Sequence, residues 1–162
     1  MKYLPIYLND HYAGSTLGLE LAKRAAKNNN GNAEFGPALA ALATEIDEDR
    51  DELRRIMERL GVSEDRIKAG LFWMGEKVGR LKPNGELLQF SPLSRVVEIE
   101  GLITGVGGKL SLWRTLLELA ERDDRLDEGE LEMRAGRAED QLLRLHALRG
   151  AAGLIALRDD IS

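Results

Sequence analysis

Apolar residues recur every three or four positions along most of the chain, which is the spacing of one buried face of an α-helix. The clearest example begins at Gly36-Pro37 and ends at Gly61. Proline suits the first turn of a helix, and glycine commonly follows the last turn. The apolar positions between them are Leu39, Leu42, Ile46, Leu53, Ile56 and Leu60. The pattern predicts a long amphipathic helix over residues 36–61.

The same periodicity predicts four more helices, each bounded by a turn or a capping signal. An asparagine cluster at 28–32 ends the first, and Pro83-Asn84-Gly85 ends a shorter third. Ser91-Pro92 opens the fourth, and Asp127, with Glu130 three residues later, opens the fifth. The expected ranges are 5–28, 36–61, 63–81, 91–122 and 127–158. Strand alternation is limited to a short segment at 86–90.

The lengths of these helices predict a bundle. Four of them are about 36 to 46 Å long, and the helix at 63–81 is about 27 Å long. Short connections make sequential helices antiparallel neighbours, so the short helix returns the chain along the bundle and helices 36–61 and 91–122 run parallel. The expected fold class is all-α, an up-down bundle of four long helices with a shorter crossover helix, forming a single domain over residues 1–162.

Composition narrows the classes of function. The chain has 162 residues, a net charge of −5 and no cysteine, which excludes disulfides, thiolate catalysis and cysteine-bound zinc. Lysine and arginine alternate with acidic residues, so nucleic-acid binding is not expected. No run approaches the roughly 18 apolar residues of a membrane span, and the N-terminus lacks an apolar targeting segment. We therefore expect a cytoplasmic protein that does not cross a membrane.

Four long helices with one crossover resemble the layout of ferritin-like bundles. The resemblance implies acidic ligands on the first and third long helices and a Glu-x-x-His motif on the second and fourth, together holding two iron or manganese ions. The acidic residues on matching helices are Glu20, Glu45 or Glu48, Glu98 or Glu100, and Glu139. The two histidines, His11 and His146, complete neither motif.

Asp49 interrupts the apolar stripe of the helix at 36–61. A buried carboxylate must be paired, hydrogen-bonded or metal-bound, or else take up a proton. Its candidate partners are His11, His146, Lys109, Arg114 and Arg149. One interpretation is a buried ion pair between helices. The alternative, suggested by the resemblance, is an atypical iron or manganese site formed by His11, Asp49, Glu100 and His146.

Four glycines, Gly101, Gly105, Gly107 and Gly108, fall inside the helix at 91–122. Each costs about 1 kcal/mol relative to alanine in a helix interior. Close packing against the first helix, which carries Gly14 and Gly18, would explain them. An apolar cavity for a small ligand beside Gly105 and Gly107 would also do so. A phosphate-binding loop is excluded, because Leu110 replaces the required Ser or Thr and no strand precedes it.

These features favour a non-catalytic protein that acts by association, as a homodimer or with an unknown protein partner. The apolar end of the fifth helix is the expected docking surface: Ala151, Leu154, Ile155 and Leu157. The alternative is a divergent ferritin-like metal-binding protein of the di-iron or di-manganese carboxylate type. No residue is predicted to be catalytic or to bind an organic cofactor.

One row of acidic residues follows the helix at 36–61: Glu45, Glu48 and Glu52. We expect this row to be a solvated face balanced by Arg50, Arg54 and Arg55.

Overall fold

The computed structural model of the protein describes residues 2–64 and 90–161. Across these ranges the chain forms long helices and a short final 3₁₀ turn, and no strand is present. The elements are α1 (Leu4–Asn28), α2 (Gly36–Arg59), α4 (Pro92–Ala120), α5 (Glu128–Leu157) and η1 (Arg158–Ile161). They agree with four of the five predicted helices within a few residues. The helix predicted at 63–81 lies almost wholly outside the described residues.

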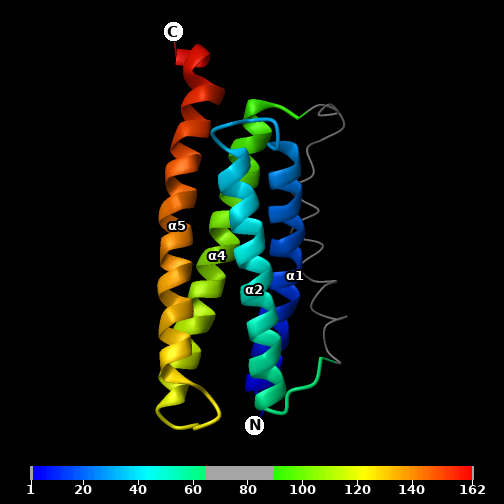
Figure 1. The fold of residues 1–162 in the computed structure, drawn as a ribbon, viewed down its shortest axis with the longest axis vertical. Helices are drawn as coiled ribbons and strands as arrows, with labels where there is room; N and C mark the ends of the chain where they lie inside the picture. Colours follow the sequence, from blue (N-terminus) through cyan, green and yellow to red (C-terminus); the bar gives the residue numbers. More distant parts are fainter. Residues whose placement is uncertain (1, 65–89, 162) are drawn as a thin grey trace.

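The four helices stand side by side in one bundle (Figure 1). α1 and α5 run in one direction, and α2 and α4 run in the other. α2 ends at the opposite end of the bundle from the start of α4, so these two helices run parallel. The predicted all-α bundle with α2 parallel to α4 is therefore confirmed, and its layout is compatible with a ferritin-like architecture. None of the described helices is long and apolar enough to cross a membrane.

The helix ends follow the local signals in the sequence. The Ser91 hydroxyl accepts a hydrogen bond from the backbone N–H of Ser94 at 3.1 Å, and the Asp127 carboxylate accepts one from the N–H of Glu130 at 2.8 Å. Gly61, just beyond α2, has φ of +70°, the left-handed conformation that a β-carbon disfavours. These contacts occupy backbone groups that a helix end leaves unpaired, and they fix where α2, α4 and α5 begin or end.

The core follows the predicted apolar stripes. α1 packs against α2 and α4, and α4 packs against α5. The largest fully buried side chains come from these helices and from the turns beside α2: Leu8, Phe35, Leu39, Leu53, Ile56, Met57, Leu60, Ile99, Leu102, Leu112, Trp113 and Leu116. α5 contributes smaller buried residues, chiefly Ala135, Ala138, Leu145 and Ala152. α4 and α5 can therefore approach closely.

The turn between α1 and α2 requires glycine at position 36. A β-carbon added there would lie 2.6 Å from the carbonyl oxygen of Asn29, a distance that side chains do not tolerate. Because the obstructing atom belongs to the backbone, it cannot move aside without shifting the turn. Gly31, in the same turn, has no described atom within 4 Å of an added β-carbon.

We expect Gly36→Ala to lower the free energy of unfolding by about 1–3 kcal/mol, the usual cost of overpacking. Urea denaturation followed by circular dichroism measures this change. Gly31→Ala is the matched control and is expected to stay close to the wild-type value. Equal stability of the two variants would contradict the close contact at Gly36.

Candidate functional site

α2 and α5 face each other through charged and polar side chains. α2 presents four acidic residues, and α5 presents three arginines and a glutamine, both sets at helical spacings of three and four. We call this set the charge seam: Glu45, Glu48, Asp49 and Glu52 from α2; Arg134, Arg137, Gln141 and Arg144 from α5; and Lys109 from α4. Because α2 and α5 are antiparallel, the acidic residues of α2 lie opposite the polar and basic residues of α5 along the charge seam.

Asp49 lies at the centre of the charge seam, with its side chain fully buried. Its Oδ2 accepts hydrogen bonds from Lys109 Nζ at 2.5 Å and from Gln141 Nε2 at 3.3 Å, and its Oδ1 accepts one from Arg134 Nη1 at 3.2 Å. Lys109 also donates to Gln141 Oε1 at 2.5 Å. Burial lowers the pKa of the Lys109 ammonium, while the Asp49 carboxylate raises it. The prediction of a buried ion pair at Asp49 is confirmed, with Lys109 among the partners foreseen and Arg134 and Gln141 added.

The charge seam continues on both sides of Asp49. The Arg144 guanidinium binds both oxygens of Glu45, at 3.0 and 2.5 Å, in the bidentate geometry that favours arginine. Burial alone would raise the pKa of Glu45, but hydrogen bonds from Arg144 and Gln141 outweigh it and hold the pKa below the ordinary value. Toward the other end of α2, Arg134 Nη2 lies 3.7 Å from Glu52 Oε2.

The expectation that Glu45, Glu48 and Glu52 form a solvated face is wrong for Glu52 and Glu45, whereas Glu48 is exposed. Glu52 is buried, and the partners of Glu45 and Glu48 come from α5 rather than from neighbouring arginines of α2. Of the three arginines expected to balance this row, Arg55 does bind Glu52, while Arg50 donates to Thr16. The signal that sequence reasoning missed is the second row, Arg134, Arg137, Gln141 and Arg144, spaced by three, four and three residues beside the apolar stripe of α5.

The four residues of the predicted metal site occupy different surroundings. His11 is half-buried with its ring 4.5 Å from that of Tyr7 in a T-shaped arrangement, and burial lowers its pKa. Asp49 is engaged in the charge seam, whereas Glu100 and His146 are exposed. Among residues 2–64 and 90–161, no three His, Asp or Glu side chains are grouped as ligands of one metal ion. The metal site therefore stays a prediction from the sequence.

The other acidic residues that the ferritin-like resemblance singled out have separate roles. Glu20 is exposed, and Glu139 pairs with Arg114 at the surface. Glu98 is buried, and its Oε1 accepts hydrogen bonds from Arg24 Nε at 3.1 Å and Asn28 Nδ2 at 2.9 Å. Burial raises the pKa of Glu98 against the influence of Arg24 and Asn28. Among the described residues, these three carboxylates therefore do not share one centre.

A cavity of about 420 Å³ lies among α1, α2 and α4. Gly14, Gly18, Gly101, Gly105 and Gly108 all line it, and so do His11, Asp49 and Lys109. Among the four glycines of α4, close packing explains Gly101, where an added β-carbon would lie 2.9 Å from Leu21 Cδ2.

For the next three glycines of α4 the close-packing interpretation is wrong. At Gly105, Gly107 and Gly108 no described atom lies within 4 Å of an added β-carbon. The alternative of an apolar cavity agrees with the structure at Gly105, while Gly107 is not part of its lining.

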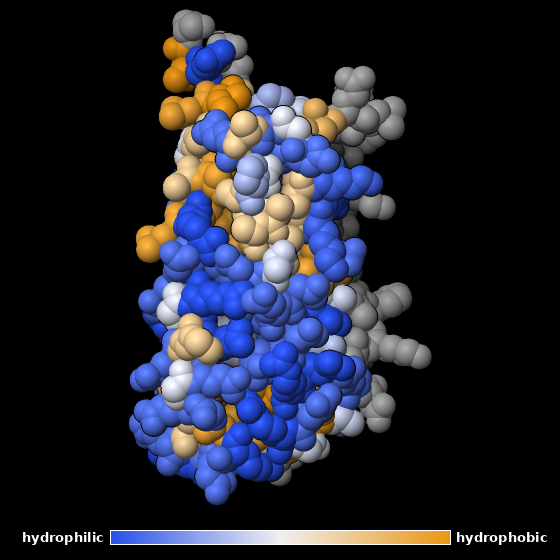
Figure 2. Space-filling view, viewed as in Figure 1, coloured by the Kyte–Doolittle hydropathy of each residue, from blue (hydrophilic) through white to orange (hydrophobic). Residues whose placement is uncertain are grey.

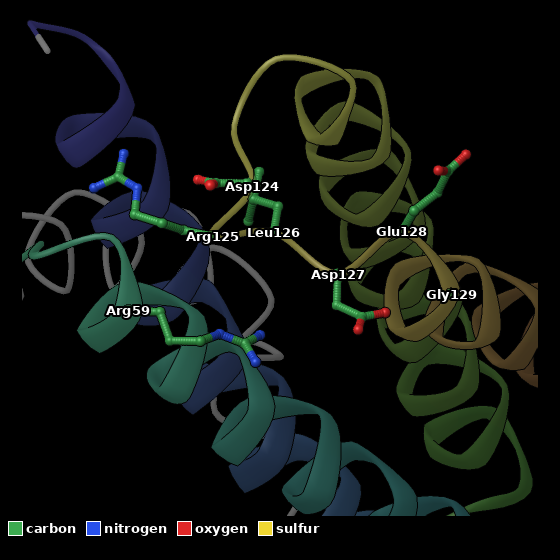
Figure 3. Close-up of a pocket in the computed structure, with 7 residues that line it drawn as sticks. All are labelled: Arg59, Asp124, Arg125, Leu126, Asp127, Glu128 and Gly129. Carbon is green, nitrogen blue, oxygen red and sulfur yellow. The ribbon is translucent and has the colours of Figure 1, made fainter.

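A wider, shallower hollow lies where α2 ends beside the connection from α4 to α5 (Figure 3). Arg59 reaches it from α2, and Asp124, Arg125 and Asp127 come from the connection. Asp127 caps α5, and Arg125 binds Asp123 and donates to the Leu60 carbonyl oxygen at 3.4 Å. These contacts hold the connection against α2, so the hollow has a structural explanation.

The outward face of α5 carries exposed apolar side chains, and Figure 2 shows apolar surface along the upper part of this helix. Leu143, Leu154 and Ile161 expose 72, 74 and 88% of their surface. We call the row that contains them the outer stripe: Leu143, Ala147, Gly150, Leu154 and Leu157 of α5, with Ile161 of the adjoining turn η1. Its spacings of four, three, four, three and four residues are those of a coiled-coil seam.

Comparisons with protein-family models, with curated proteins and with solved structures give no match for this chain. Its function must therefore be inferred from the charge seam, the cavity and the outer stripe.

Truncation of Asp49 tests the charge seam. We expect Asp49→Ala to lower the free energy of unfolding by about 3–5 kcal/mol, because it leaves Lys109 and Arg134 without their shared anion inside the bundle. Adding Lys109→Met should recover part of that loss, since one of the two orphaned cations is then removed.

Denaturant unfolding of both single variants and the double variant gives the coupling energy between Asp49 and Lys109. Lys23→Met is a control, because the Lys23–Asp47 pair is half-exposed and should contribute little. Additive effects at Asp49 and Lys109 would contradict the pairing.

Proposed function

We propose that this protein acts by association and that two copies pair through the outer stripes of their α5 helices. The supporting observation is the outer stripe itself, a regular apolar row on the side of α5 that the bundle does not bury. Single exposed leucines are ordinary on protein surfaces, but a row with this spacing is not. The function is structural rather than catalytic: the bundle presents α5 as a dimerisation helix.

The spacing of the outer stripe identifies another helix as its partner. Steps of four and three residues keep the apolar row on one side of a helix that winds around a neighbour. The part of the row on α5 spans residues 143–157, or about 21 Å of helix. Small residues at its middle, Ala147 and Gly150, allow two helix backbones to approach closely.

The order of side chains within the outer stripe favours a second copy in antiparallel orientation. From Leu143 to Leu154 the row reads large, small, small, large, so it is symmetric about its midpoint. A two-fold axis there would place Leu143 of one copy against Leu154 of the other, and Ala147 against Gly150. A two-fold dimer requires this kind of self-complementary surface.

Because one helix pair buries less than the roughly 800 Å² per partner of a standard interface, we expect a dissociation constant of micromolar order.

Cysteine cross-linking tests both the dimer and its orientation, since the chain has no cysteine of its own. Mixing a Leu143→Cys protein with a Leu154→Cys protein under mild oxidation is expected to give a disulfide-linked dimer, measured on a non-reducing gel. Each variant alone should cross-link poorly. Self-cross-linking of Leu143→Cys would instead indicate a parallel pair, and no cross-link above an Ala41→Cys control on α2 would contradict the dimer.

A charged residue in the outer stripe should dissociate the pair. We expect Leu154→Glu to weaken dimerisation by about tenfold or more in analytical ultracentrifugation, because a carboxylate would be buried between the helices. Leu93→Glu replaces an exposed leucine of α4 and serves as the matched control. If both variants dimerise as the wild type does, the outer stripe is not the interface.

The second candidate function is that of a divergent ferritin-like metal-binding protein. It is supported by the layout of the bundle and by His11 and Asp49, which line one cavity. This candidate predicts stoichiometric iron or manganese in protein purified without a histidine tag, as measured by elemental analysis, and a loss of that metal in His11→Ala. Substoichiometric metal in the wild type would contradict it.

A further inference from the structure

The cavity among α1, α2 and α4 offers a small molecule mostly apolar walls. Its volume of about 420 Å³ lies within the usual range for small-molecule sites, about 300–1,000 Å³. The apolar side chains of its wall are Ile46, Leu53, Leu102, Val106, Leu112 and Trp113. All of them are buried, so the cavity reaches into the core.

Missing side chains keep this volume open. Gly18, Gly105 and Gly108 line the cavity, and an added β-carbon at any of them would meet no described atom within 4 Å. A glycine inside a helix costs about 1 kcal/mol relative to alanine. At these positions no close contact between the described helices requires glycine, and the absence of a side chain leaves more open space in the cavity than a larger residue would.

The charges around the cavity balance. Its lining contains two acidic residues, Asp10 and Asp49, and two basic residues, Arg50 and Lys109. Lys109 binds Asp49, and Arg50 donates to Thr16. Burial lowers the pKa of His11, so this residue is mainly uncharged at neutral pH. The lining therefore provides no net charge to hold an ionic ligand.

We propose that this cavity binds an uncharged, largely apolar small molecule. The apolar walls supply most of the binding free energy. This proposal does not depend on the dimer, because the cavity lies among α1, α2 and α4 and the outer stripe lies on α5.

Nile red, an uncharged dye, is the probe for this proposal. Its fluorescence rises in apolar surroundings, so titration gives the affinity for the wild type and for two variants. Gly105→Leu fills space in the cavity and is expected to weaken binding by about tenfold or more. Gly107→Leu makes the same change two residues away, outside the lining, and is expected to bind like the wild type.

Circular dichroism of both variants establishes that they are folded. Absence of Nile red binding to the wild type, or equal binding to both leucine variants, would overturn the proposal.

Discussion

The buried carboxylate of Asp49 needs cationic partners inside the bundle, and the arrangement of three helices depends on that need. Lys109 reaches it from α4 and Arg134 from α5, so α2, α4 and α5 meet at one anion. A buried charge is costly when unpaired, and few alternative helix registers would bring both cations within hydrogen-bonding distance. The interaction therefore acts mainly on specificity: it selects one alignment of α5 on α2.

This constraint divides α5 into three faces with different partners. One face carries small apolar residues, such as Ala135 and Ala138, and packs in the core. A second face carries the arginines of the charge seam. The third face carries the outer stripe, which neither the core nor the charge seam uses. Lys109, on α4, belongs both to the charge seam and to the cavity wall. A ligand in the cavity would therefore lie beside the polar centre around Asp49.

Local features of the fold could be predicted from the sequence, while distances between helices could not. Ser91 and Asp127 begin helices because their capping bonds are made with residues three positions away. The buried ion pair at Asp49 also followed from its place on an apolar stripe. Arg134 as its partner did not, because the two residues are 85 positions apart. Periodicity gives the face on which Gly105 lies, but not how far the next helix is from it, so close packing was expected where the structure has a cavity.

The central claim is that the polar contacts at Asp49 fix the register of α5. It can be tested in a protein that carries four substitutions: Asp49→Leu, Lys109→Met, Arg134→Met and Gln141→Leu. Spin labels on cysteines introduced at Ala41 of α2 and Glu132 of α5 report the alignment by electron–electron double resonance. We expect the variant to remain helical but to give a broader distance distribution than the labelled wild type. A distribution as narrow as that of the wild type, in a folded variant, would contradict the claim.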